Sequence, residues 1–141
     1  MGYIGSFVDY EGLDDLVAAA AMLRDRGINF DLLLVGDGLA RESVLAAAAR
    51  LGLADRLSAP GRVPAARVPS YYALIDVCVY PRKPWPVCEM VSPLKPCEAM
   101  ANGKAVLASS VGALSELVKH GQTGLLFEKG DRAALAAGLE R

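Results

Sequence analysis

The chain has 141 residues, and 53% of them are apolar, which is enough to bury the core of one ordinary domain. The formal net charge of -1 comes without a run of basic residues, so nucleic acid and anionic membrane surfaces are disfavoured as partners. No apolar run is long enough to span a bilayer or to serve as a signal peptide, which predicts a soluble, cytosolic protein without a transmembrane segment.

Short apolar strands alternate with helical stretches along the chain, a pattern typical of a parallel sheet with helices on both faces. In chain order we expect a strand at 3–7, a helix at 13–23, a strand at 30–35, a helix at 44–51, a weaker strand at 57–59, a helix at 68–74, a strand at 77–80, a helix at 94–101, a strand at 105–109, a helix at 114–118, a strand at 124–127 and a helix from 131. The predicted fold class is α/β with a Rossmann-like parallel sheet. The first helix is well defined, because its apolar residues recur every three or four positions, at Leu13, Leu16, Val17, Ala20 and Leu23.

The cysteines point to neither a disulfide framework nor a metal site. Cys78, Cys88 and Cys97 are odd in number and lack CxxC spacing. We therefore expect ordinary thiols.

The residues between 81 and 95 form the longest segment without a predicted element. They follow a strand and precede a helix, which places them at the carboxyl edge of the sheet, where ligands bind in open α/β folds. Long loops in compact domains are usually functional. This segment therefore belongs to the predicted site.

Two glycine-bearing loops also follow strands. Gly36-Asp-Gly38 begins like a dinucleotide fingerprint, but Arg41 stands where the third glycine would be, so an NAD-type site is disfavoured and a tight turn is the alternative. The loop from Gly5 to Gly12 leads into the first helix, where it would either let a phosphate approach or act as a plain turn.

Charged residues surround the predicted helix start at Pro96. Lys95 would oppose the positive end of the helix dipole, and a bound anion would remove that conflict. Free N–H groups, the dipole and one ammonium suit a phosphate or diphosphate, while Glu98 and Glu89 would reach sugar hydroxyls. The alternative is that Glu89 and Lys95 are solvated loop charges and Glu98 is a favourable first-turn acid.

Two other residues have both a functional and an ordinary interpretation. His120 is either a catalytic group or a surface turn residue. Trp85 would either stack on a base or sugar, or cap the core below the long segment. The sequence favours neither functional role.

The motifs also form a series whose order and spacing are specific as a set. They are Gly5 to Gly12, Leu33-Leu-Val-Gly-Asp-Gly38, Gly61-Arg-Val63, Tyr80-Pro81, Glu89, Glu98-Ala-Met-Ala-Asn-Gly103, Val111-Gly112 with Glu116, and Gly121-Gln-Thr-Gly-Leu-Leu-Phe127. Across essentially the whole chain, this series resembles the second half of retaining GT-B glycosyltransferases of glycosyltransferase family 4, or group 1.

The resemblance implies a single nucleotide-sugar donor-binding domain over residues 1–141, one of two Rossmann-like domains that face each other across a cleft. The acceptor-binding domain would precede Met1, so the isolated chain is expected to be inactive. The complete enzyme would transfer a hexosyl group, with retention, from a donor such as a UDP- or GDP-sugar to a saccharide or lipid-linked saccharide. It would need no metal and no cofactor, and would lie in the cytoplasm or at the inner face of the membrane through the missing domain.

The resemblance also implies roles for individual residues. Glu89 would approach the sugar hydroxyls, Glu98 would hold the ribose hydroxyls, and Lys95 would stabilise charge on the leaving diphosphate. Further donor contacts would come from the first loop, the turn after residue 61 and the segment between the glutamates, at Gly5, Ser6, Arg62, Val63, Ser92, Pro93 and Leu94.

One departure from the family concerns the spacing of the two glutamates. Eight residues separate Glu89 from Glu98, where seven are usual in the family. Either the segment has gained one residue or the role of Glu89 has shifted.

A second departure concerns positive charge. The basic pair that the family carries in its first loop is absent, and Glu11 stands at one of its positions. The charge would then come from Lys95, with Arg82 or Lys83 on the same long segment. Glu11 is expected to point away from the diphosphate or to bind a sugar hydroxyl.

Two other functions are compatible with these residues. One is a binding module for nucleotide sugars or phosphosugars that transfers nothing. The other is a GT-B nucleotide-sugar epimerase, which needs an acid and a base at the sugar ring, and for these the chain offers Glu89 and His120.

Overall fold

The computed structural model describes all 141 residues and contains one six-stranded parallel sheet. The strands are β1 (Gly2–Ile4), β2 (Leu32–Val35), β3 (Leu57–Gly61), β4 (Val77–Tyr80), β5 (Ala105–Ser109) and β6 (Leu125–Phe127). Their order across the sheet is β3-β2-β1-β4-β5-β6, so the direction of winding reverses between β1 and β4. Ligands of open α/β sheets bind at such a reversal, outside the carboxyl ends of the strands.

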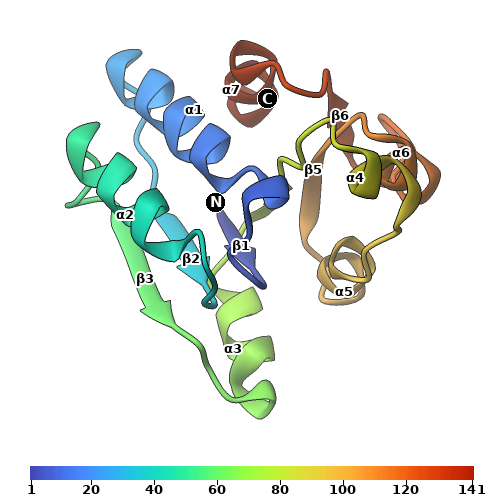
Figure 1. Ribbon diagram of the computed structural model, residues 1–141, viewed down its shortest axis with the longest axis horizontal. Coiled ribbons are helices and arrows are strands. Elements are labelled where there is room, and N and C mark those ends of the chain that lie inside the picture. Colours follow the sequence, from blue (N-terminus) through green and yellow to red (C-terminus); the bar gives the residue numbers. More distant parts are fainter.

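Helices cover both faces of the sheet. They are α1 (Leu13–Asp25), α2 (Arg41–Arg50), α3 (Val68–Ala73), α4 (Pro86–Met90), α5 (Lys95–Ala101), α6 (Gly112–Leu117) and α7 (Arg132–Glu140), with short 3-10 turns at Asp9–Glu11 and Ala65–Arg67. Helix α1 packs against α2 and α7, whereas α5 packs against β4 and β5. Figure 1 shows α1, α2 and α7 along one side of the sheet, with α3 and α5 along the other. The predicted α/β, Rossmann-like fold class is confirmed.

The hydrophobic core is one continuous cluster of 31 buried residues between the sheet and its helices. The five apolar residues predicted to form the stripe of the first helix are all buried, and all belong to this core cluster. Every helix in the structure is too short or too polar to cross a membrane.

Two predicted elements differ from the structure at the edge where the site lies. The strand predicted at 3–7 ends at Ile4, although Gly5 and Phe7 continue to donate backbone hydrogen bonds to the Val35 and Asp37 carbonyls, at 2.9 Å each. The segment predicted to be irregular contains α4, whose first turn holds Pro86. Proline suits that position because its missing N–H has no partner inside the helix.

Gly36 lets the loops after β1 and β2 touch. Its φ is 135°, and a Cβ atom there would overlap the carbonyl of Gly5. Only glycine fits this contact. The ends of the two strands are thereby held together beneath one cavity.

Candidate functional site

A cavity of about 330 Å³ opens at the carboxyl ends of β1, β2 and β3. Its walls come from the loops that follow these strands and from the starts of α3 and α5, and the lining residues are Ile4, Gly5, Ser6, Val35, Gly36, Asp37, Arg62, Val63, Val68, Lys95 and Glu98. This is the edge of the sheet where the sequence predicts a ligand site.

The cavity collects most of the predicted site residues, from segments far apart in the sequence. Those that line it are Gly5, Ser6, Arg62, Val63, Lys95 and Glu98. Asp37 also lines it and was missed by the sequence analysis, although the Gly36-Asp-Gly38 turn carried the signal. Its carboxylate accepts a hydrogen bond of 2.8 Å from the Gly38 N–H.

The other predicted site residues lie outside the lining of this cavity. Ser92 and Leu94 are exposed, whereas Pro93 is buried. The backbone beside them is fixed, because the Val91 carbonyl accepts a 2.8 Å hydrogen bond from Arg82 Nη1.

Lys95 is the first residue of α5, and its ammonium reaches back to the first loop. Nζ lies 2.8 Å from Glu11 Oε1 and 5.7 Å from the centre of the Tyr3 ring. A Cβ atom at position 5 would collide with the Lys95 side chain, so Gly5 makes room for it. Because α5 has only seven residues, its dipole is small and the ammonium is the main positive charge at this helix start.

Glu11 is 1% exposed and holds two cations through a single oxygen. Arg82 Nη2 lies 3.0 Å from the same Oε1 atom that Lys95 contacts, and Arg82 is itself 6% exposed. Neither Glu11 Oε2 nor Arg82 Nε has a hydrogen-bond partner. With one carboxylate between two cations, the Arg82–Glu11–Lys95 triad keeps one net positive charge behind the cavity. Glu11 does not line the cavity.

Two buried tyrosines donate hydrogen bonds to the loop and the helix start beside the cavity. The Tyr3 hydroxyl donates a 2.9 Å hydrogen bond to the Ser6 carbonyl, and the Tyr80 hydroxyl donates one of 2.9 Å to the Lys95 carbonyl. Burial, and then the negative charge of Glu11, raise the pKa of Tyr3, while burial raises that of Tyr80. Both phenols therefore stay protonated and keep donating.

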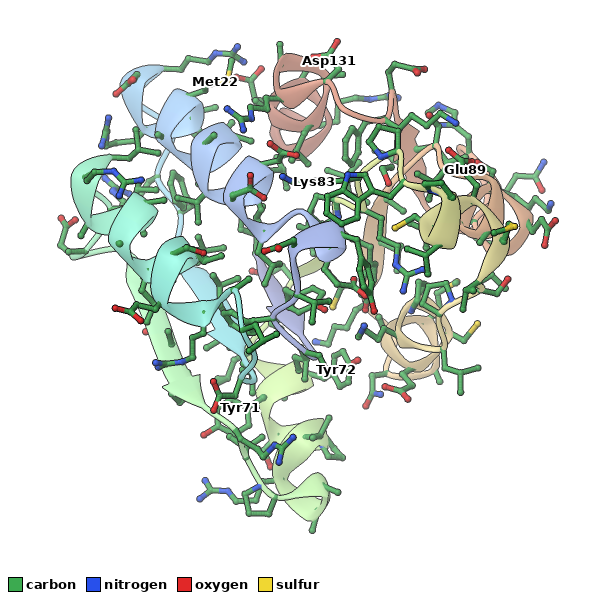
Figure 2. The ribbon with its side chains drawn as sticks, viewed as in Figure 1. Met22, Tyr71, Tyr72, Lys83, Glu89 and Asp131 are labelled. Atoms are coloured by element: carbon green, nitrogen blue, oxygen red, sulfur yellow. The ribbon has the colours of Figure 1, made fainter.

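Glu89 lies on α4, beside α6, as Figure 2 shows. Its Oε2 accepts a 2.6 Å hydrogen bond from the Gly112 N–H, and its Oε1 lies 2.6 Å from Lys129 Nζ. These two partners, with Lys129 the stronger, hold the pKa of the half-buried carboxyl below its ordinary value. In this conformation Glu89 anchors the start of α6.

Of the three candidates for the missing positive charge, Lys95 alone lines the cavity. Arg82 is buried in the triad. Lys83 lies beside α1 (Figure 2) and binds Asp14 Oδ2 at 2.8 Å. Both residues line a second cavity, together with residues of α1 and α2.

Trp85 and His120 take ordinary positions. Trp85 lines the second cavity, with its ring centre 6.5 Å from that of Tyr10. His120 Nδ1 accepts a 3.0 Å hydrogen bond from the Leu126 N–H, beside a third cavity near α7. Neither residue reaches the cavity at the ends of β1–β3.

This geometry suits a polar, anionic ligand with several hydroxyls. Arg62 and Lys95 supply positive charge at the walls, while Glu98 and Asp37 supply hydrogen-bond acceptors. The parallel sheet, with this cavity at the carboxyl ends of its strands, is Rossmann-like.

Comparison with known proteins identifies the family. The chain matches the family described as Glycosyl transferases group 1 over residues 1–141, and it belongs to that family. It is 34% identical to 2-deoxystreptamine glucosyltransferase of Streptomyces kanamyceticus over 141 residues, which are 100% of this chain and 35% of the relative. The chain spans about a third of the length of the curated relatives it matches.

Solved structures of similar proteins have the same fold. The structure of sucrose-phosphate synthase from Thermosynechococcus elongatus is 33% identical, with a TM-score of 0.85, and the match covers 99% of this chain and 35% of that one. The Anabaena protein HepE, solved in complex with UDP and glucose, is 27% identical, with a TM-score of 0.79 over 96% of this chain and 36% of its own. The fold is therefore the Rossmann-like half found in GT-B glycosyltransferases.

Proposed function

We propose that residues 1–141 are the donor-binding domain of a retaining glycosyltransferase, and that the cavity at the ends of β1–β3 holds a nucleoside diphosphate sugar without a metal ion. The observation that carries the proposal is the Lys95 ammonium at the cavity wall, which belongs with Glu11 and Arg82 to a triad of one net positive charge. A diphosphate is the part of the donor that needs such a charge. The complex of HepE with UDP and glucose supports this ligand class.

The remaining walls suit the other parts of the donor. Glu98, three residues after Lys95 along α5, is exposed and free to accept hydrogen bonds from ribose hydroxyls. Arg62 and Val63 follow β3 and would meet the base, largely through backbone groups. Gly5 and Ser6 would let the diphosphate approach the end of β1.

Transfer would depend on the charge that builds on the leaving diphosphate as its bond to the anomeric carbon breaks. Lys95 would stabilise that charge, and the contacts to base and ribose would hold the donor in place. Ser92, Pro93 and Leu94 would contribute backbone contacts to the diphosphate. Glu89 would offer its remaining acceptor capacity to the sugar hydroxyls, beside the bonds to Lys129 and Gly112. The acceptor, a saccharide or lipid-linked saccharide, would bind outside this chain.

The test is a calorimetric titration of the protein at its full natural length with UDP, GDP and ADP, in the presence of a chelator. We expect one nucleotide to bind, and Lys95→Met to weaken it at least tenfold, because a hydrogen bond to a charged group is lost. Lys119→Met, at an exposed lysine away from the cavity, is the matched control. No binding to the folded protein, or equal affinities for the two variants, would contradict the proposal.

Transfer with retention has its own test. The protein would be supplied with the sugar conjugate of the nucleotide that binds, together with candidate saccharide acceptors. An NMR spectrum of the product should show the same anomeric configuration as the donor, and an inverted product would overturn the mechanism.

A further inference from the structure

The first loop places a buried carboxylate directly behind the cavity, at a position where the resemblance predicts a basic residue. Glu11 Oε1 contacts Lys95 Nζ at 2.8 Å and Arg82 Nη2 at 3.0 Å, while Oε2 has no partner. A buried carboxylate with one oxygen unpaired is costly for folding alone. The contacts that Glu11 does make are those of Oε1, with Lys95 and Arg82.

Two members of the triad are buried, and only Lys95 faces the cavity. Arg82 is buried, and its second amino group donates to the Val91 carbonyl, so it cannot turn away from Glu11. Glu11 is buried as well, whereas the Lys95 side chain is 23% exposed and lines the cavity. Arg82 thus fixes Glu11, and Glu11 fixes the ammonium that faces a ligand.

We infer that Glu11 is a positioning residue, which holds the Lys95 ammonium against the cavity wall where the diphosphate of a bound nucleotide would lie. This inference rests on the donor site proposed above. A lysine side chain has four rotatable bonds and loses much conformational entropy when a ligand immobilises it. The pair with Glu11 immobilises it beforehand, and the ammonium still has two further N–H donors for phosphate oxygens.

If Glu11 acted by its charge alone, the expected change in diphosphate affinity would have the opposite sign. A carboxylate behind an anion site repels the anion, so if it acted by charge alone, its removal would strengthen diphosphate binding. Arg82 limits that repulsion, because it neutralises Glu11 through the same oxygen. The direction of the change in affinity therefore separates positioning from repulsion.

The experiment is a double-mutant cycle on the full-length protein with Glu11→Gln, Lys95→Met and the pair. Two probes are titrated: the nucleoside diphosphate that binds the wild type, and its nucleoside, followed by NMR because its affinity is weaker. We expect Glu11→Gln to weaken the diphosphate about tenfold, a size usual for coupled neighbours, and to leave the nucleoside unchanged. In the Lys95→Met background, the same substitution should have no effect on either probe.

Two further variants serve as a substitute and a control. Glu11→Asp keeps the charge that Arg82 needs but withdraws the carboxylate by one methylene, so it should fold and show the same selective loss if Glu11→Gln does not fold. Asp14→Asn breaks the Lys83–Asp14 pair, which has the same 2.8 Å separation but lies at the second cavity, and it should leave both affinities unchanged.

The affinities decide whether Glu11 positions Lys95 or repels the anion. Tighter diphosphate binding by Glu11→Gln, an equal loss for both probes, or a loss that persists without the lysine would each overturn positioning. Failure of the wild type to bind any of UDP, GDP and ADP would overturn the donor site itself, and the inference with it.

Discussion

The hydroxyl of Tyr80, the last residue of β4, donates a 2.9 Å hydrogen bond to the main-chain carbonyl of Lys95, the first residue of α5. The bond spans the whole segment that carries α4 and ties the helix start to the centre of the sheet. Tyr80 is 1% exposed, so water does not compete for this bond. The backbone of Lys95 is held by Tyr80, and its side chain is held by Glu11.

Tyr80→Phe removes only the hydroxyl and leaves the Lys95 carbonyl without this donor. We expect the free energy of unfolding to fall by about 1–2 kcal/mol, and nucleotide affinity to fall with it, because the helix start loosens. Urea unfolding and calorimetry measure the two effects. Tyr71→Phe, at a half-buried tyrosine on α3 (Figure 2), is the control and should change stability by less than about 0.5 kcal/mol. Equal effects of the two substitutions would show that the Tyr80 bond is unimportant.

Gly5→Ala should displace Lys95 while the fold persists. The new Cβ would meet the flexible stem of Lys95, which can move aside, but also the buried Tyr3 hydroxyl, at a backbone φ of 157° that alanine rarely adopts. We therefore expect weaker nucleotide binding together with a loss of stability. At Gly36 the clash is with the Gly5 backbone carbonyl, which cannot move, so Gly36→Ala should lower the melting temperature markedly. The comparison is made by calorimetry and thermal unfolding. An unchanged affinity in folded Gly5→Ala would contradict the placement of Lys95.

Glu11→Gln should also destabilise the protein, because Arg82 would keep a buried charge without its carboxylate. Removal of one partner of a buried ion pair costs about 3–5 kcal/mol. The double variant Glu11→Gln/Arg82→Met removes both charges and should recover much of that loss in urea unfolding. If the single and double variants unfold at the same urea concentration, the Arg82–Glu11 pair is not what stabilises this region.

The pKa of Glu89 predicts a dependence of stability on pH. Because Lys129 and the Gly112 N–H lower this pKa in the folded state, the carboxylate contributes stability above the ordinary glutamate value of about 4.3. That contribution is lost as pH falls through the lowered folded value. The difference in unfolding free energy between wild type and Glu89→Gln should therefore shrink in acid. A difference that stays constant down to that range would contradict the paired geometry.

Glu98 can be tested with a ligand that lacks one hydroxyl. If Glu98 binds the ribose, Glu98→Gln should weaken the nucleoside diphosphate more than its 2′-deoxy analogue, by roughly fivefold to tenfold. Calorimetry with both ligands measures the difference. Glu42→Gln, at an exposed glutamate on α2, is the control and should leave both affinities unchanged. Equal losses of affinity for the two ligands in Glu98→Gln would show that Glu98 does not contact the 2′-hydroxyl of the ribose.

Local sequence patterns predicted most of the fold. The strand at 77–80 and that at 105–109 have the predicted bounds, because uninterrupted apolar runs are typical of strands buried on both faces. Helix α4 was missed because its five residues are too few for a periodicity, and prolines at 84 and 86 favour a loop. The first strand was predicted too long because Phe7 is buried beyond the turn at Gly5.

The site was predictable in part. Lys95 and Glu98 are close together in sequence and share a short helix, so their grouping follows from local structure. The contacts of Glu11 with Lys95 and Arg82 join positions 84 and 71 residues apart, and no local pattern encodes them. Charge alone indicated that Glu11 should avoid an anion, but only the fold reveals that it binds the cation beside it.

In the proposed complex, the diphosphate of a nucleotide lies against the Lys95 ammonium. The most direct measurement is a crystal structure of the full-length protein with the nucleoside diphosphate that binds in calorimetry. We predict a phosphate oxygen within hydrogen-bonding distance of Lys95 Nζ, with the Glu11–Lys95 contact retained and the ribose beside Glu98. A nucleotide bound in the second cavity between α1 and α2, or one whose phosphates lie away from Lys95, would contradict the account.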